Sequence, residues 1–409
     1  MRKEFLSHPV ALVIAMILPT IAAAANPSDA PSVTQTNNQG SVVWSASTGL
    51  GYDSNAYQAP RAIYIDYAAL PIGSNPMVTP QAKSGFFVPY DIKLSMAKSR
   101  DQDNKLLGSA TADGSFYFGG LSNANEYSAG LSGGLEHALA RKGKLEDTLT
   151  VGAFIKKRRH VYVDHDSGLS KTTTGGGNVS DRYSYMSMGV KAEYKNETGN
   201  IDYGLNGQYA QNNYDDPIVV SQLDHTYYSL GADASIPVTS ETKLSLSLNH
   251  FVRDYSDRHS RNAQGVYLNA NPLLRYTYNA FGTTLRSRLS PEWLVYLDFD
   301  HTRRADNYVN YGDFNKNRYG ARLIYEQGSV KARVALHHWK QDYPNGFAFD
   351  VASRGAKKYN GNVLKIKAEW AQTKNTALWG ELDYTTQNTT DLRYDYDRKL
   401  IMAGMSWAY

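Results

Sequence analysis

The chain has 409 residues, of which 20% are charged, and a formal net charge of +4 at pH 7. It contains no cysteine, which excludes disulfides, thiol catalysis and thiolate metal sites. The small excess of basic residues argues against a nucleic-acid partner, and we expect none.

Residues 1–25 have the pattern of a secretory signal peptide. Two basic residues near the start precede an apolar run, Val10–Leu18, and small residues follow at Ala22–Ala25. The apolar run is shorter than the roughly 20 residues that a membrane-spanning helix needs. We therefore expect export and cleavage close to Ala25.

The rest of the chain divides into a short stub and one large domain. Residues 26–40 are polar without periodicity, so we expect a disordered periplasmic stub. Along residues 41–409, apolar and polar side chains alternate; Ile366, Ala368 and Trp370, for example, share one face of a strand. This period of two predicts an all-β domain, although the mean hydropathy is −0.50.

The alternation predicts about sixteen antiparallel strands, with fourteen or eighteen if one hairpin is miscounted. A tilted strand needs about 9–11 residues to cross a bilayer, and each predicted strand is longer. In chain order we expect strands at residues 41–55, 86–99, 105–118, 124–139, 145–161, 182–195, 199–213, 223–236, 241–255, 271–287, 291–304, 315–327, 329–342, 359–373, 375–388 and 393–409.

The connections between these strands alternate in length. Ala140–Lys144 and Asn196–Gly199 are typical of the short ones, and Gly119–Asn123 is short where a long loop is expected. Short turns on one side and long loops on the other are typical of a transmembrane β-barrel of the bacterial outer membrane. The long connections lie near residues 56–85, 162–181, 256–270, 305–314 and 343–358.

Aromatic residues are abundant, with 31 tyrosines and 6 tryptophans. Many lie near predicted strand ends, where we expect their rings at the level of the lipid headgroups. They include Tyr183, Tyr185, Tyr227, Tyr228, Tyr276, Tyr278 and Trp293.

The alternation continues to the last residue of the chain. Because an open strand edge is unfavourable in lipid, we expect this strand to pair with residues 41–55. Gly404, Trp407 and Tyr409 have the spacing of the C-terminal insertion signal of outer-membrane barrels, which implies the barrel assembly machinery as a partner.

Two motifs at the ends of the domain resemble known families. The stretch GYDSNAY, residues 51–57, and the stretch YDYDRKL, residues 394–400, resemble the β-barrel porin 2 group and the barrel domain of surface lipoprotein assembly modifiers. This resemblance implies an outer-membrane barrel and leaves open whether it is a pore or a secretion barrel.

The polar face of each strand predicts the lining of the lumen. Both signs of charge occur in similar numbers, so we expect a hydrated lumen without strong ion preference. The loop at residues 56–85, with four prolines, is the segment that we expect to plug or narrow it. The principal lumen-lining candidates are Lys93, Lys156, Arg158, Lys191, Asp298, Asp300, Arg322, Lys331, Arg333, Lys365, Lys367, Glu369, Glu381 and Asp383.

The densest basic cluster is Lys156–His160. Arginine and lysine at the outer leaflet suit the phosphates of lipopolysaccharide, so we expect outer-membrane lipid and lipopolysaccharide as partners. Alternatively, successive side chains of the cluster point into the lumen mouth and into water.

Enzyme readings are weak. His165 and Ser167 have the spacing that a phospholipase strand needs, but no orienting asparagine accompanies them. The adjacent pair His337 and His338 would point to opposite sides of a strand, and Gly175–Gly177 lacks the lysine of a phosphate loop. We expect no catalytic residue, no cofactor and no metal site.

These observations favour an outer-membrane pore for passive diffusion or export of hydrophilic solutes or polymer. The alternatives are a secretion barrel that assists surface display of proteins, and an outer-membrane enzyme or structural barrel. A homotrimer is compatible with sixteen strands.

Overall fold

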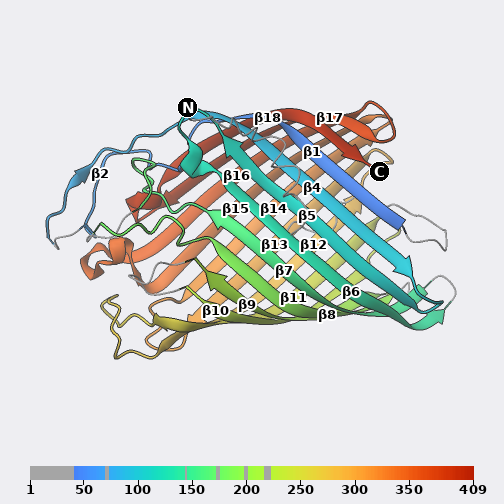
Figure 1. Ribbon diagram of the computed structural model, residues 1–409, viewed down its shortest axis with the longest axis horizontal. Helices are drawn as coiled ribbons and strands as arrows, with labels where there is room; N and C mark the ends of the chain where they lie inside the picture. Colours follow the sequence, from blue (N-terminus) through green and yellow to red (C-terminus); the bar gives the residue numbers. More distant parts are fainter. Residues whose placement is uncertain (1–40, 70–72, 143–144, 172–175, 198–200, 216–222) are drawn as a thin grey trace, which may run out of the picture.

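In the computed structural model, residues 41–69, 73–142, 145–171, 176–197, 201–215 and 223–409 are described. The predicted signal peptide and stub, residues 1–25 and 26–40, lie outside the described residues. Within the described part, sixteen antiparallel strands close into one barrel, as Figure 1 shows. The predicted fold class and strand number are thus confirmed.

The barrel strands are β1 (Ser41–Asp53), β4 (Gly85–Ser99), β5 (Asn104–Tyr117), β6 (Glu126–Lys142), β7 (Leu145–His160), β8 (Tyr185–Glu197), β9 (Asp202–Tyr214), β10 (His225–Pro237), β11 (Thr242–His259), β12 (Leu273–Arg288), β13 (Trp293–Asp306), β14 (Phe314–Gln327), β15 (Val330–Phe347), β16 (Ala356–Ala371), β17 (Thr376–Thr389) and β18 (Tyr396–Ala408).

The alternation of each strand separates the two faces of the barrel wall. On β1, Val42 and Leu50 are 59% and 54% exposed, whereas Gly51 and Asp53 on the other face are buried. Large apolar side chains are exposed in the same way on strands around the barrel, with Leu230 of β10 at 68%. The outer face is therefore apolar. In the described part of the chain, no helix is long and apolar enough to cross a membrane.

The barrel closes at a seam between β1 and β18. Gly49 and Gly404 lie opposite each other there, and a Cβ atom on Gly404 would come within 2.1 Å of the Thr48 carbonyl oxygen. Trp44 and Tyr409 exchange backbone hydrogen bonds of 2.9 and 2.8 Å, and their rings stack at 4.8 Å. The last residue of the chain thus takes part in closing the barrel.

The two ends of the barrel differ. One end carries the short turns, together with the start of β1 and the C-terminus; the other, at the left of Figure 1, carries the long loops and is called the long-loop end here. The short connection predicted at 119–123 contains the 3-10 turn η2 (Ser122–Ala124), after Gly119 and Gly120 with φ of 65° and 83°. Only glycine adopts such angles without strain.

Two loops at the long-loop end are shorter than predicted. β11 continues to His259 and β15 to Phe347, so the predicted loops at 256–270 and 343–358 begin several residues too early. Backbone pairing continues beyond the alternating segment through register shifts, after Asp254 in β11 and after Asp342 in β15. Side-chain alternation marks only the part of a strand with one apolar face, whereas backbone pairing extends further.

The connection between β1 and β4 contains a small hairpin that was predicted as loop. Its strands are β2 (Tyr64–Ile65) and β3 (Met77–Val78). The Tyr64 hydroxyl donates a 2.8 Å hydrogen bond to Asp166, and the ring packs against Phe349. The described part of this connection therefore contacts other loops at the long-loop end, and Arg61 also reaches Asp397 of β18 at 3.3 Å. The remaining 3-10 turns there are η3 (Ala348–Asp350), η4 (Ala352–Arg354) and η5 (Leu392–Tyr394).

Candidate functional site

The strand register identifies the inner face of the barrel. Ser45 of β1 is level with Lys93 of β4, which in turn is level with Thr111 of β5, so these three side chains share one face. It is the face opposite the exposed apolar side chains. Continued around the barrel, the same register places on this inner face Lys93, Lys156, Arg158, Lys191, Asp298, Asp300, Arg322, Lys331, Arg333, Lys365, Lys367, Glu369, Glu381 and Asp383.

On one part of this wall, opposite charges are paired. Lys365 Nζ lies 2.6 Å from the Asp383 carboxylate, and Lys367 Nζ lies 2.8 Å from Glu369. The first pair joins β16 to β17, and the second lies within β16. We call this stretch of the inner face the compensated wall. It extends through β18 to β1 and β4, where Lys93 lies 3.4 Å from Asp91. The positive charges here have a carboxylate beside them.

Elsewhere on the inner face, some cations are paired, as Arg318 is with Asp300 at 2.7 Å, but several have no such partner. Within the described part of the chain, Lys156, Lys191, Arg253, Arg304 and Lys316 form no ion pair. They lie on strands β7 to β14, and we call this stretch the cationic wall. The sequence analysis did not single out the last three of them.

Aromatic rings lie beside three of these cations, Arg253, Arg304 and Lys316. The Arg304 guanidinium lies 4.1 Å from the ring centroid of Tyr276 and 4.5 Å from that of Phe314. Lys316 Nζ lies 5.0 Å from the centroid of Trp339. Such cation–π contacts stabilise a cation by about 0.5–2 kcal/mol and leave its charge uncancelled.

The rings belong to an aromatic arc that lines the lumen near the long-loop end. The prediction of a headgroup position was wrong for Tyr185, Tyr227, Tyr276 and Tyr278, because the register turns them inward. In β12, Phe281 and Leu285 have the opposite parity and point outward, so counting parity identifies the inward tyrosines. Centroid distances along the arc are 5.0 Å for Tyr185–Tyr214, 5.8 Å for Tyr214–His225, 5.0 Å for His225–Tyr255, 6.0 Å for Tyr255–Tyr276, 6.3 Å for Tyr276–Tyr278, 6.2 Å for Tyr278–Phe314 and 5.5 Å for Phe314–Tyr343.

Two buried aspartates hold the compensated wall at the long-loop end. Asp53, at the end of β1, is fully buried. Its carboxylate accepts hydrogen bonds of 2.6 Å from Arg398 of β18 and 2.8 Å from the Tyr117 hydroxyl of β5. This network ties together strands on both sides of the seam.

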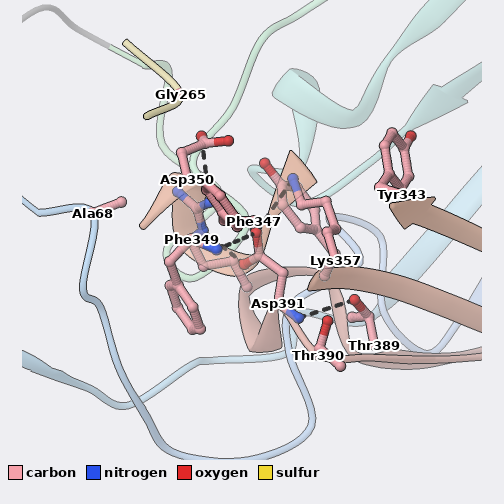
Figure 2. A network of polar contacts seen from close by, with 12 residues as sticks. Ala68, Gly265, Tyr343, Phe347, Phe349, Asp350, Lys357, Thr389, Thr390 and Asp391 are labelled. Atoms are coloured by element: carbon pink, nitrogen blue, oxygen red, sulfur yellow. Dashed lines mark hydrogen bonds and ion pairs between the residues drawn. The ribbon is translucent and has the colours of Figure 1, made fainter. Parts of the chain in front are cut away.

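Asp391, between β17 and η5, is the second fully buried aspartate, and Figure 2 shows its contacts with Lys357 and Thr389. Arg393 donates two hydrogen bonds of 2.9 Å to its carboxylate, and the backbone N–H of Phe349 donates a third of 2.9 Å. Burial alone would raise the pKa of Asp391, but the hydrogen bonds and charge of Arg393 lower this pKa below its ordinary value.

The basic cluster Lys156–His160 is divided between the two faces. Register places Lys156, Arg158 and His160 inside and the two side chains between them outside. Of the outer two, Lys157 forms a 2.5 Å ion pair with Asp215.

His165 and Ser167, considered above as candidate catalytic residues, contact different groups and not each other. His165 Nδ1 lies 2.6 Å from the Tyr57 carbonyl oxygen, and the Ser167 hydroxyl donates a 3.1 Å hydrogen bond to Asp164. His337 faces inward and His338 outward. Among the described residues, no group of three metal-ligating side chains is found.

Comparison with known proteins gives similarity in structure only. No protein-family model and no curated protein matches the chain. OmpF of Salmonella typhi, in complex with daunomycin, is 14% identical with a TM-score of 0.47, over 90% of this chain and 97% of OmpF. A loop L8 deletion mutant of OmpT, an outer-membrane protein of Vibrio cholerae, is 7% identical with a TM-score of 0.46, over 90% and 99%. The outer-membrane channel DcaP of Acinetobacter baumannii is 10% identical with a TM-score of 0.41, over 91% and 98%.

Proposed function

We propose that the chain forms a hydrated pore across the bacterial outer membrane, for passive diffusion or export of hydrophilic solutes or polymer. The observation that carries this proposal is the closed sixteen-strand barrel of the described residues, with an apolar outer face and a charged inner face. An apolar outer belt suits lipid, and a barrel of this size is wide enough for water.

Passage through such a pore needs no chemical step. Polar side chains of the lumen replace the water around a hydrophilic solute, and the width of the lumen and the loops at its mouth set the size limit. We propose no catalytic residue and no cofactor.

The proposed setting includes export through a cleaved signal peptide at residues 1–25 and insertion by the barrel assembly machinery through Gly404, Trp407 and Tyr409. Outer-membrane lipid surrounds the apolar face, lipopolysaccharide meets the outward Arg159, and the barrel assembles as a homotrimer. The motifs at residues 51–57 and 394–400 support the proposed relation to the β-barrel porin 2 group. A secretion barrel related to the surface lipoprotein assembly modifiers is the second candidate, and the motif at residues 51–57 favours it equally.

The test is single-channel conductance of the refolded protein in a planar bilayer, beside a variant that lacks residues 59–84. Steady ohmic conductance supports the pore, and larger conductance of the deletion variant identifies this loop as the constriction. Closed barrels in both proteins, each shown to be folded by heat-modifiable migration on gels, contradict the pore and favour the secretion barrel.

A further inference from the structure

A cavity of about 510 Å³ lies on the inner face of strands β5 to β11. Every lining side chain belongs to the lumen face that the register defines. Small-molecule sites have volumes of about 300–1,000 Å³, and they combine ring surface with a few polar groups that fix orientation. The cavity has this composition.

Its lining contains cations and no carboxylate. Lys156, Lys191 and Arg253 line the cavity, and no aspartate or glutamate does. Nε of Arg253 is buried without a hydrogen-bond partner among the described residues. Asp113 and Glu126 line a separate cavity of about 250 Å³ that shares Lys156, and Asp224 accepts a hydrogen bond from the backbone N–H of Tyr214. An anionic group is the ligand that such donors favour.

Aromatic rings form another part of the lining. Tyr185, Tyr214 and Tyr227 contribute, and all three are only partly buried. The first two have centroids 5.0 Å apart with their planes inclined by 35°. They offer the flat, partly apolar surface that a ring-shaped solute can pack against.

Neutral polar groups complete the lining. The side chains of Gln208 and Ser187 line the cavity and make no hydrogen bond to other described residues. Amide and hydroxyl groups both donate and accept, so they match a ligand rich in hydroxyls better than one with a bare hydrocarbon ring.

We propose that this cavity binds an acidic sugar of one or two rings, whose carboxylate pairs with a cation of the lining and whose ring packs on the tyrosines. The proposal names the solute class of the proposed pore and rests on that function. Arg253 is the carboxylate-binding residue, because its guanidinium already lacks a partner for Nε.

The test is calorimetric titration of the refolded, detergent-solubilised full chain with digalacturonate, lactose and benzoate. We expect digalacturonate to bind at least about tenfold more tightly than lactose or benzoate, and Arg253→Gln to weaken it by about tenfold. The matched control is Arg286→Gln, which removes an inward cation of β12 outside the cavity and should leave affinity unchanged.

Equal affinity for lactose and digalacturonate, tighter binding of benzoate, or equal loss in the two variants would overturn the proposal. If Arg253→Gln fails to fold, Lys191→Gln takes its place, because Lys191 is exposed to the lumen. A conducting protein that does not bind digalacturonate contradicts only this inference, whereas a binding protein that does not conduct contradicts the pore.

Discussion

The compensated wall and the cationic wall of the lumen are made from the same alternating strands but differ in how charge is stabilised. On the compensated wall, Lys365 and Lys367 have carboxylates within 3 Å. On the cationic wall, Arg304 and Lys316 lie against aromatic faces and keep their charge available. Polar alternation therefore specifies a lumen wall, and the neighbours across the strands specify what that wall can bind.

We expect the largest effect from a substitution at the β1–β18 seam, which lies within the compensated wall. Gly404→Ala should prevent stable closure, because its Cβ would overlap the Thr48 carbonyl oxygen at 2.1 Å. The control is Gly133→Ala in β6, where the nearest atom would be 3.8 Å away. Heat-modifiable migration after refolding in vitro measures closure. A Gly404→Ala protein that refolds normally but fails to insert in cells would contradict the steric explanation and favour a role in the insertion signal.

A smaller loss is expected from the buried ion pair of the same wall. Asp53→Ala leaves the Arg398 guanidinium without its carboxylate and should lower the free energy of unfolding by about 3 kcal/mol. Asp91→Ala, at an exposed pair of 3.4 Å, should cost about 0.5 kcal/mol. Urea unfolding in detergent measures both, and equal losses would show that burial does not distinguish the two pairs.

Ion selectivity gives a direct comparison of the walls. Replacing Arg253, Arg304 and Lys316 together by glutamine should shift the reversal potential in a salt gradient toward cation preference, because three positive charges without carboxylate partners are removed from the lumen wall. Removing the paired Lys93 and Asp91 together should shift it less, since the local charge stays balanced. The reverse order of the two shifts would refute the distinction between the walls.

The smallest effect is a pH dependence at Asp391. The pKa of this aspartate is lowered in the folded protein from its ordinary 3.8, so its stabilisation is complete above pH 3.8 and is lost as the pH falls through the folded pKa. The urea midpoints of wild type and Asp391→Asn should therefore differ at pH 6 and converge below pH 3.8. A difference that persists undiminished at pH 2.5 would contradict this role.

Some features followed from the chain alone. The period of two predicted sixteen strands because a barrel wall has one apolar and one polar face, and loop lengths predicted which ends carry the long connections. The extensions of β11 to His259 and of β15 to Phe347 did not follow from it, since backbone pairing there continues after the side-chain pattern ends. The headgroup position predicted for Tyr276 and Tyr278 was wrong, because a position near a strand end does not say which face a side chain occupies, whereas parity does.

The sequence by itself determined the alternation of faces, the lumen candidates on them and the aromatic end of the chain. Only the tertiary structure decided which cations are paired with a carboxylate. Ion pairs such as Lys365–Asp383 join different strands, and the sequence does not state the register of those strands. It likewise decided that Asp53 is buried against Arg398, which lies 345 residues away in the chain. Local periodicity is encoded residue by residue, whereas charge compensation depends on cross-strand neighbours brought together by closure.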